Sequence, residues 1–117
     1  YLQLRNQIIY AIVKAELREG EYLPSVRDMA ETVGINMHTV NKAYAMLRQE
    51  GYLRLDRRHG AIVAVDVDEI KARMELAQTM DLILAQAICK NVSREDVHEL
   101  VDEIYNQYEG YRNGESL

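Results

Sequence analysis

The sequence predicts a mostly α-helical fold with a small β-hairpin, on the strength of three observations. Apolar residues recur at helical spacing over most of the chain, and two short β-prone runs stand at residues 52–55 and 61–65. The chain also divides by charge, because residues 1–65 carry a net charge of +2 and residues 66–117 a net charge of −7. The order of these elements predicts an N-terminal winged helix-turn-helix domain (residues 1–65), then a C-terminal antiparallel hairpin of two helices (residues 66–117).

The first predicted helix covers residues 2–18. Leu4, Ile8 and Ile12 recur at the spacing of one helix face, and Gly20 lies where such a helix is expected to have stopped. Because the sequence begins at Tyr1 and not at a methionine, we expect that a few preceding residues are missing.

A helix-turn-helix pattern follows. Ser25, directly after the chain's only proline, is expected to cap a short helix that ends at Gly34. Asn36 is expected to cap a second helix that ends near Gly51, with an apolar face made of Val40, Ala43, Tyr44 and Leu47. The opposite face, which in a recognition helix meets base edges in the major groove, carries Met37, His38, Asn41, Lys42 and Ala45.

The two β-prone runs flank a turn cluster at residues 56–60, which ends in glycine. Three of its five residues, Arg57, Arg58 and His59, can carry positive charge. A protruding basic turn next to a helix-turn-helix is well placed to contact phosphates or the minor groove, so we interpret this hairpin as the wing.

Two long helices are predicted for the acidic half. Asp66, with a glutamate three residues later, resembles a capping box for a helix that continues to about Lys90, and Ser93 gives a second capping signal. The second helix is expected to end near Gly110 and residues 113–117 to fray. A two-helix hairpin cannot bury its apolar stripes alone, so we expect self-association. The predicted dimer interface comprises Ile70, Met74, Ala77, Leu84, Ile88, Leu100, Val101, Ile104 and Tyr108.

The composition excludes several classes of protein. Apolar residues make up 48% of the 117, enough for a packed core, yet no run approaches the roughly 18 apolar residues of a membrane span. The start lacks the order of a signal peptide, so we expect a cytoplasmic protein. Cys89 is the only cysteine, which excludes an internal disulfide.

The run from Gly20 to Val63 resembles the DNA-binding domain of GntR-type bacterial transcriptional regulators. The matching segments are Gly20-x-x-Leu23-Pro24-Ser25-x-Arg27-x-Met29-Ala30, Val33-Gly34-Ile35-Asn36-x-x-Thr39-Val40-x-x-Ala43-Tyr44-x-x-Leu47, Gly51-Tyr52-Leu53 and Gly60-x-x-Val63. The short remainder resembles the YtrA subfamily, in which two helices serve dimerisation and whose members commonly repress operons that encode transporters. The resemblance implies a homodimeric repressor that binds a two-fold operator in double-stranded DNA.

The resemblance also implies which residues contact DNA. Ser25 matches a position that contacts phosphate, and Arg27 matches an arginine that reaches bases, where paired hydrogen bonds to guanine discriminate by about 1–3 kcal/mol. The recognition-helix positions are Asn36, Met37, His38, Thr39, Asn41 and Lys42, and the wing positions are Arg57, Arg58, His59 and Gly60. Many members have arginine where Met37 and Asn41 stand here. We therefore expect Arg27 and the wing to read DNA more than the recognition helix does.

The sequence gives less support to two other classes of function. The net charge of −5 slightly favours a winged-helix protein-interaction module without specific DNA binding, but the face of Arg27, Thr39 and Lys42 lacks the apolar anchors of a protein-binding groove. An enzyme is disfavoured, because the histidines lie on separate predicted elements and no phosphate-binding glycine loop or carboxylate pair is visible.

No catalytic residue, metal site or cofactor is predicted. Glu95, His98 and Asp102 have a spacing that suits a divalent ion, although solvated side chains on an acidic helix are the simpler interpretation. Tyr105, Tyr108 and Tyr111 would line a pocket between protomers or pack in the dimer core, and the latter is simpler. Whether a small-molecule effector acts on the protein is left unknown.

Overall fold

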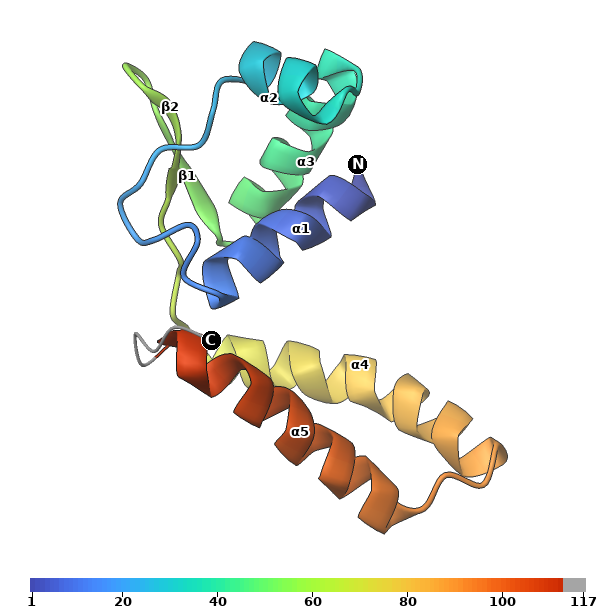
Figure 1. Cartoon of the computed structure of the whole chain (residues 1–117). Coiled ribbons are helices and arrows are strands. Elements are labelled where there is room, and N and C mark those ends of the chain that lie inside the picture. The colour runs from blue at the N-terminus through green and yellow to red at the C-terminus, as the bar shows by residue number, and fades with distance from the viewer. Residues whose placement is uncertain (113–117) are drawn as a thin grey trace. The chain divides into compact units, whose positions relative to one another are not determined.

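The computed structural model describes residues 1–112 and divides the chain into two compact units. The N-terminal unit is Tyr1–Asp66 and the C-terminal unit is Val67–Leu117. The elements, labelled in Figure 1, are α1 (Leu2–Val13), α2 (Val26–Val33), α3 (Met37–Gln49), β1 (Leu53–Asp56), β2 (Gly60–Val63), α4 (Glu69–Cys89) and α5 (Arg94–Arg112). The predicted fold class, mostly helical with one small β-hairpin, is confirmed.

The core of the N-terminal unit is built around α3, which packs against α1, α2 and β1. One face of α3 is buried along its whole length, as its apolar spacing predicted. The other elements contribute one to three buried side chains each. The buried apolar side chains are Leu4, Ile8, Leu23, Ala30, Val40, Ala43, Tyr44, Leu47, Leu53, Ala61, Ile62 and Val63.

The first helix is shorter than predicted and ends at Val13 instead of near residue 18. Ala15 adopts a left-handed conformation with φ of 59°. The N–H of Glu16 then donates to the Ala11 carbonyl at 2.8 Å and the N–H of Ala15 to the Ile12 carbonyl at 3.1 Å. These are the two bonds of a Schellman cap, which usually needs glycine at the left-handed position. Because alanine occupies it here, the sequence carries no stop signal.

The helix-turn-helix forms as its local signals predicted. The hydroxyl of Ser25 accepts from the N–H of Asp28 at 3.1 Å and caps α2. Gly34 ends α2 in the left-handed region, with φ of 76°. Ile35 and Asn36 then lead directly into α3, so the two helices are joined by a tight turn.

The wing is an antiparallel pair in which Leu53 faces Val63 and Asp56 faces Gly60. Its turn is therefore residues 57–59, two residues shorter than predicted. The segment that precedes α2 adds to the other edge of β2. Tyr22 forms a bridge with Ile62, and main-chain bonds of 2.8 to 2.9 Å join residues 20–23 to Ala61 and Val63.

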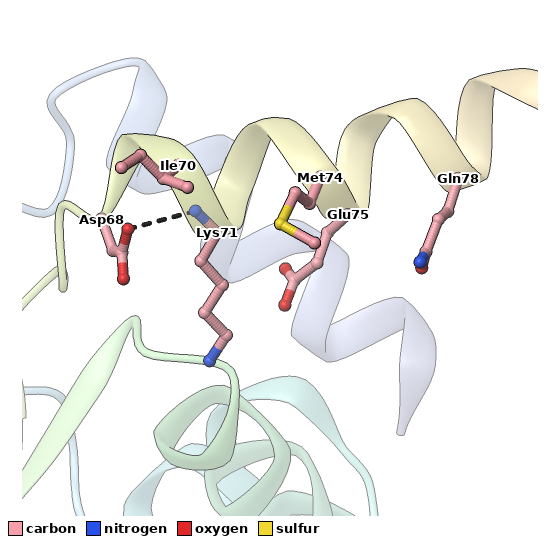
Figure 2. Close-up of a pocket in the computed structure, with 6 residues that line it drawn as sticks. All are labelled: Asp68, Ile70, Lys71, Met74, Glu75 and Gln78. Atoms are coloured by element: carbon pink, nitrogen blue, oxygen red, sulfur yellow. Dashed lines mark hydrogen bonds between the residues drawn. The ribbon is translucent and has the colours of Figure 1, made fainter.

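The first helix of the C-terminal unit begins later than predicted. Asp68, not Asp66, is its N-cap, and its side chain accepts from the N–H of Lys71 at 3.1 Å (Figure 2). The N–H of Asp66 instead donates to the carbonyl of Gly51 at 2.8 Å. This bond holds Asp66 on the N-terminal unit, so the helix can start only after it.

A tight turn reverses the chain between α4 and α5. Asn91 adopts a left-handed conformation with φ of 62°, and the N–H of Val92 donates to the Ala87 carbonyl at 2.9 Å. Ser93 then caps α5 through a bond from the N–H of Asp96 at 3.1 Å, as predicted. α5 continues past Gly110, where it was expected to end, to Arg112. The expected fraying of residues 113–117 lies outside the described residues.

The described residues contain neither a membrane-spanning helix nor a cluster of metal ligands. None of the helices there combines the length and the apolar character needed to cross a membrane. Within residues 1–112, no three His, Cys, Asp or Glu side chains gather closely enough to hold a metal ion.

Candidate nucleic-acid interface

The burial of α3 determines which side chains it can present to a ligand. Val40, Ala43 and Leu47 have no exposed surface, so they fix the orientation of the helix on the core. On the opposite face, the first turns present Met37, His38, Asn41 and Lys42 as exposed side chains and Thr39 as a half-buried one. This surface offers hydrogen-bonding groups and one formal positive charge.

Two of the predicted contact residues also cap helices. The Oδ1 atom of Asn36 accepts from the N–H of His38 at 2.6 Å, which leaves its amide nitrogen to donate outward. The hydroxyl oxygen of Ser25 accepts from the N–H of Asp28, so its O–H group can donate a hydrogen bond to a phosphate. In both residues the capping bond fixes the side chain before any ligand arrives.

Arg27 lies in the first turn of α2 with its side chain exposed. Glu31, one turn further along α2, is the internal partner that the sequence offers, yet the two form no ion pair, and Arg27 makes no hydrogen bond through its side chain within residues 1–112. All of its N–H donors are thus available for a carboxylate, phosphate or guanine.

Lys42 is held near the start of α1. Its Nζ atom lies 5.5 Å from the centre of the Tyr1 ring, a distance at which a cation and an aromatic face attract each other. The contact restricts a long side chain that would otherwise sample many rotamers. It leaves the charge at the exposed surface of α3.

An ion pair fixes α1 on the far end of α3. Arg5 donates from Nε and Nη2 to the two carboxylate oxygens of Glu50, at 2.7 and 2.9 Å. This hydrogen-bonded carboxylate raises the pKa of Arg5. The pair is structural, because Glu50 follows the last residue of α3 and the candidate DNA-facing residues lie at its start.

The wing turn gathers its polar groups around one carboxylate. Asp56 accepts the N–H of Arg58 at 2.9 Å and the hydroxyl of Tyr22 at 2.9 Å, and its Oδ2 lies 3.4 Å from Nδ1 of His59. The backbone bond from Arg58, then the bond from Tyr22, lowers the pKa of Asp56. The same bond to Asp56 raises the pKa of Tyr22. Arg57, Arg58 and His59 remain exposed.

The structure brings the predicted DNA-facing groups to one end of the N-terminal unit. Figure 1 shows the wing turn, the start of α2 and the start of α3 together at that end, at the top of the view. Sequence reasoning missed Tyr22 and the role of Asp56. No local pattern links them, since 34 residues separate the pair.

The residues predicted for a dimer interface lie on α4 and α5, and none of them is buried. Ile70 and Ile88 are 77% and 72% exposed, while Leu84 and Tyr108 are half-buried. Figure 2 shows Ile70 and Met74 on a side of α4 that also carries Lys71, Glu75 and Gln78. Other exposed apolar residues of α4 were not in the predicted interface, namely Leu76, Leu82 and Ile83.

A capped helix-turn-helix whose second helix has one exposed polar face, together with a basic two-stranded wing, defines the class of winged helix-turn-helix DNA-binding proteins. Residues 1–63 match the family described as bacterial regulatory proteins, gntR family. The chain therefore belongs to the GntR family of bacterial regulatory proteins.

Two proteins with similar sequences come from Bacillus subtilis (strain 168). The chain is 32% identical to the HTH-type transcriptional repressor YtrA over 114 residues, which cover 94% of this chain and 87% of the relative. It is 36% identical to the uncharacterised HTH-type transcriptional regulator YhcF over 77 residues, 63% of this chain; that match spans just under two thirds of the relative's length, 64%. The predicted similarity to YtrA-type members is confirmed.

Solved structures resemble the chain over most of its length. A transcriptional antiterminator from Listeria monocytogenes EGD-e superposes with a TM-score of 0.83 at 27% identity, over 100% of this chain and 87% of that one. YtrA from Sulfolobus acidocaldarius, a GntR-family transcription factor, has a TM-score of 0.56 at 32% identity, over 90% of this chain and 86% of that one. The similarity thus extends beyond the winged helix into α4 and α5.

Proposed function

We propose that the protein is a homodimeric transcriptional repressor that binds a two-fold DNA operator. The observation that carries the proposal is the exposed guanidinium of Arg27, which makes no hydrogen bond or ion pair within residues 1–112. Arg27 lies in the first turn of α2, and Figure 1 shows the start of α2 at the same end of the unit as the start of α3 and the wing turn. Repression is supported by the 32% identity to a relative that is a repressor. The resemblance to the YtrA subfamily further supports a transporter operon as the target and, with DNA as ligand, a place in the cytoplasm.

Charge supports DNA as the ligand of the N-terminal unit. The net charge of residues 1–65 is +2, although the whole chain carries −5. A polyanion is attracted by local potential and not by net charge, so an acidic C-terminal unit does not prevent binding. In the proposed contact, Ser25 and Lys42 hold phosphates, Arg27 and the start of α3 face the major groove, and the wing turn meets the minor groove.

The C-terminal unit supports a second copy of the chain as partner. No side chain between Val67 and Tyr111 is buried, although both helices are rich in apolar residues. A cavity of about 440 Å³ lies between α4 and α5, lined mostly by apolar side chains that include Leu84, Val97 and Val101. Another pair of helices would cover these faces, and a two-fold dimer would present two recognition helices to half-sites about 34 Å apart.

The competing function, a protein-interaction module, has less support. A groove that captures a protein needs apolar or aromatic anchors. Met37 is the one large apolar side chain exposed at the start of α3, and its neighbours His38 and Asn41 are polar.

The experiment that tests the function is selection of binding sites from a random pool of DNA duplexes with the full chain. We expect enrichment of a sequence with two-fold symmetry, bound with a steep salt dependence, because each neutralised phosphate contributes about −0.9 to the slope of log K against log salt. If no symmetric sequence is enriched and the selected duplexes bind no better than scrambled ones, the proposal is wrong.

Arg27→Ala then tests the proposed contact. We expect a loss of about tenfold to 100-fold in affinity for the selected operator, together with relaxed preference at one base pair of each half-site. Arg48→Ala is the matched control, because Arg48 is also exposed but lies in the last turn of α3, away from the candidate interface. Equal losses in the two variants would show that Arg27 contributes only charge.

A further inference from the structure

An acidic side chain stands in the turn that is proposed to meet DNA. Asp56 ends β1 and precedes Arg57, Arg58 and His59, so its charge lies among the groups expected to approach phosphates. By charge alone, a carboxylate here weakens binding to a polyanion. A structural task that offsets this repulsion would explain why the wing contains it.

The contacts of Asp56 show what that task is. Its Oδ1 accepts the N–H of Arg58 at 2.9 Å, which closes the turn on itself. Its Oδ2 accepts the hydroxyl of Tyr22 at 2.9 Å, a residue from the segment that pairs with β2. One carboxylate therefore joins the wing turn to the chain that leads into α2.

His59 is restrained by the same group of residues. Its Nδ1 lies 3.4 Å from Oδ2 of Asp56, and its ring centre lies 5.0 Å from that of Tyr22, with the ring planes 49° apart. A carboxylate can only accept, so the nitrogen that faces Asp56 carries the hydrogen. The other ring nitrogen, Nε2, is then left without a hydrogen bond within the described residues.

We propose that Asp56, assisted by Tyr22, is the positioning residue of the wing: it holds the turn and the His59 ring in the orientation that binds DNA. This inference rests on the proposed function, in which the wing contacts DNA. Asp56 itself touches no base or phosphate. It acts through His59 and the backbone of Arg58, and it fixes the ring so that Nε2 is available to the minor groove.

Asp56→Ala gives the first test, because charge and positioning predict opposite results. Loss of a negative charge near DNA should tighten binding, whereas loss of the three contacts should weaken it, and we expect an affinity about fivefold lower. Glu31→Ala is the matched control, since Glu31 is an exposed acidic residue of α2. It should bind operator as tightly as the unchanged protein or more tightly.

Two more variants separate positioning from general loss of structure. Asp56→Asn keeps one acceptor oxygen, which can still accept the N–H of Arg58, but it places an amide NH2 group where Oδ2 faces Tyr22 and His59, so its affinity should lie between those of Asp56→Ala and the unchanged protein. Tyr22→Phe keeps the ring beside His59 and removes only the hydroxyl, with an expected loss of about twofold to threefold. Thermal unfolding of each variant checks that the N-terminal unit is folded. If Asp56→Ala is unfolded, Tyr22→Phe takes its place as the test of the inference.

A double-mutant cycle completes the test. If Asp56 acts largely through His59, Asp56→Ala should lower affinity by less than about twofold in a His59→Ala background. Binding by Asp56→Ala and Tyr22→Phe at unchanged or higher affinity would overturn the inference while leaving the proposed function intact. If Arg57→Ala/Arg58→Ala also leaves operator affinity unchanged, the wing does not contact DNA, and both the inference and that part of the proposed function are wrong.

Discussion

The two units contain the same kinds of apolar residue but use them differently. In the N-terminal unit, α1, α2, α3 and the wing enclose a core in which Val40, Ala43 and Leu47 have no exposed surface. In the C-terminal unit, Ile70 and Ile88 remain mostly exposed and no side chain between Val67 and Tyr111 is buried. The difference shows that the N-terminal unit buries its apolar core within one chain. The apolar faces of the C-terminal unit stay exposed in a single chain and need a partner to bury them.

The largest effect is expected for a substitution in the core of the N-terminal unit. Leu47→Ala removes a fully buried side chain in the last turn of α3 and leaves a cavity, so we expect a loss of about 2–5 kcal/mol in the free energy of unfolding. Urea denaturation measures it. Leu55→Ala, at a position of β1 that is 55% exposed, is the control and should cost less than about 0.5 kcal/mol. Similar losses at both positions would contradict the assigned core.

The next prediction tests the C-terminal unit. Ile104→Glu places a charge on an apolar face of α5 that is 52% exposed in one chain. If a second copy covers that face, dimer dissociation should become easier by on the order of 100-fold, about 3 kcal/mol. Sedimentation should then show a mass near 13.5 kDa instead of twice that value. Gln86→Glu adds the same charge at an exposed polar position, and an unchanged mass in both variants would exclude α5 from the interface.

A buried tyrosine of the N-terminal unit and an exposed tyrosine of the C-terminal unit extend the comparison between the two units. Burial raises the pKa of Tyr44 to about 12, and its hydroxyl donates to the Pro24 carbonyl at 2.8 Å. Tyr44→Phe should cost about 1 kcal/mol at neutral pH because that carbonyl loses its partner, whereas Tyr105→Phe, at an exposed position of α5, should cost nothing measurable.

The raised pKa also sets a pH dependence with a definite sign. A tyrosine whose folded pKa lies above its unfolded value of about 10 contributes full stability below pH 10, and this is lost as the pH rises toward 12. The difference in unfolding free energy between the original protein and Tyr44→Phe should therefore shrink over that range. A difference that is constant from pH 9 to pH 11 would show that Tyr44 ionises as freely as in the unfolded chain.

The smallest expected effect compares the two helix ends that lack glycine. Ala15→Gly should stabilise the N-terminal unit by about 0.5 kcal/mol, because alanine strains the left-handed conformation that glycine adopts freely. Asn91→Gly, at the equivalent position after α4, should change stability less, since asparagine tolerates that conformation. Ala11→Gly, inside α1, should instead cost about 1 kcal/mol. Destabilisation by Ala15→Gly would contradict the assigned conformation.

Sequence patterns predicted the elements whose signals are local. Ser25, Gly34 and Asn36 each act within a few residues of themselves, and all three caps form as expected. The predicted start of α4 was wrong because Asp66 and Asp68 are equally good helix caps when only their sequence neighbours are considered. A hydrogen bond to Gly51, fifteen residues away, decides between them.

The candidate interface was predictable only in part for the same reason. The exposure of Arg27 and of the first turns of α3 follows from helix periodicity and from the resemblance to a known domain. The Tyr22–Asp56 contact does not, because it depends on how the segment before α2 pairs with the wing. A pairing between segments that are distant in the sequence produces no periodic residue pattern in either segment, so the sequence alone does not predict it.

The pairing of residues 20–23 with β2 also limits how the protein can adapt to different DNA sequences. Only Leu23, Pro24 and Ser25 separate the bridged Tyr22 from the first residue of α2, so α2 and the wing are tethered at short range. Under the proposed function, the base pair contacted by Arg27 and the minor-groove position contacted by the wing should keep a constant offset within every half-site. An operator bound in this way should tolerate insertions between half-sites better than insertions inside one.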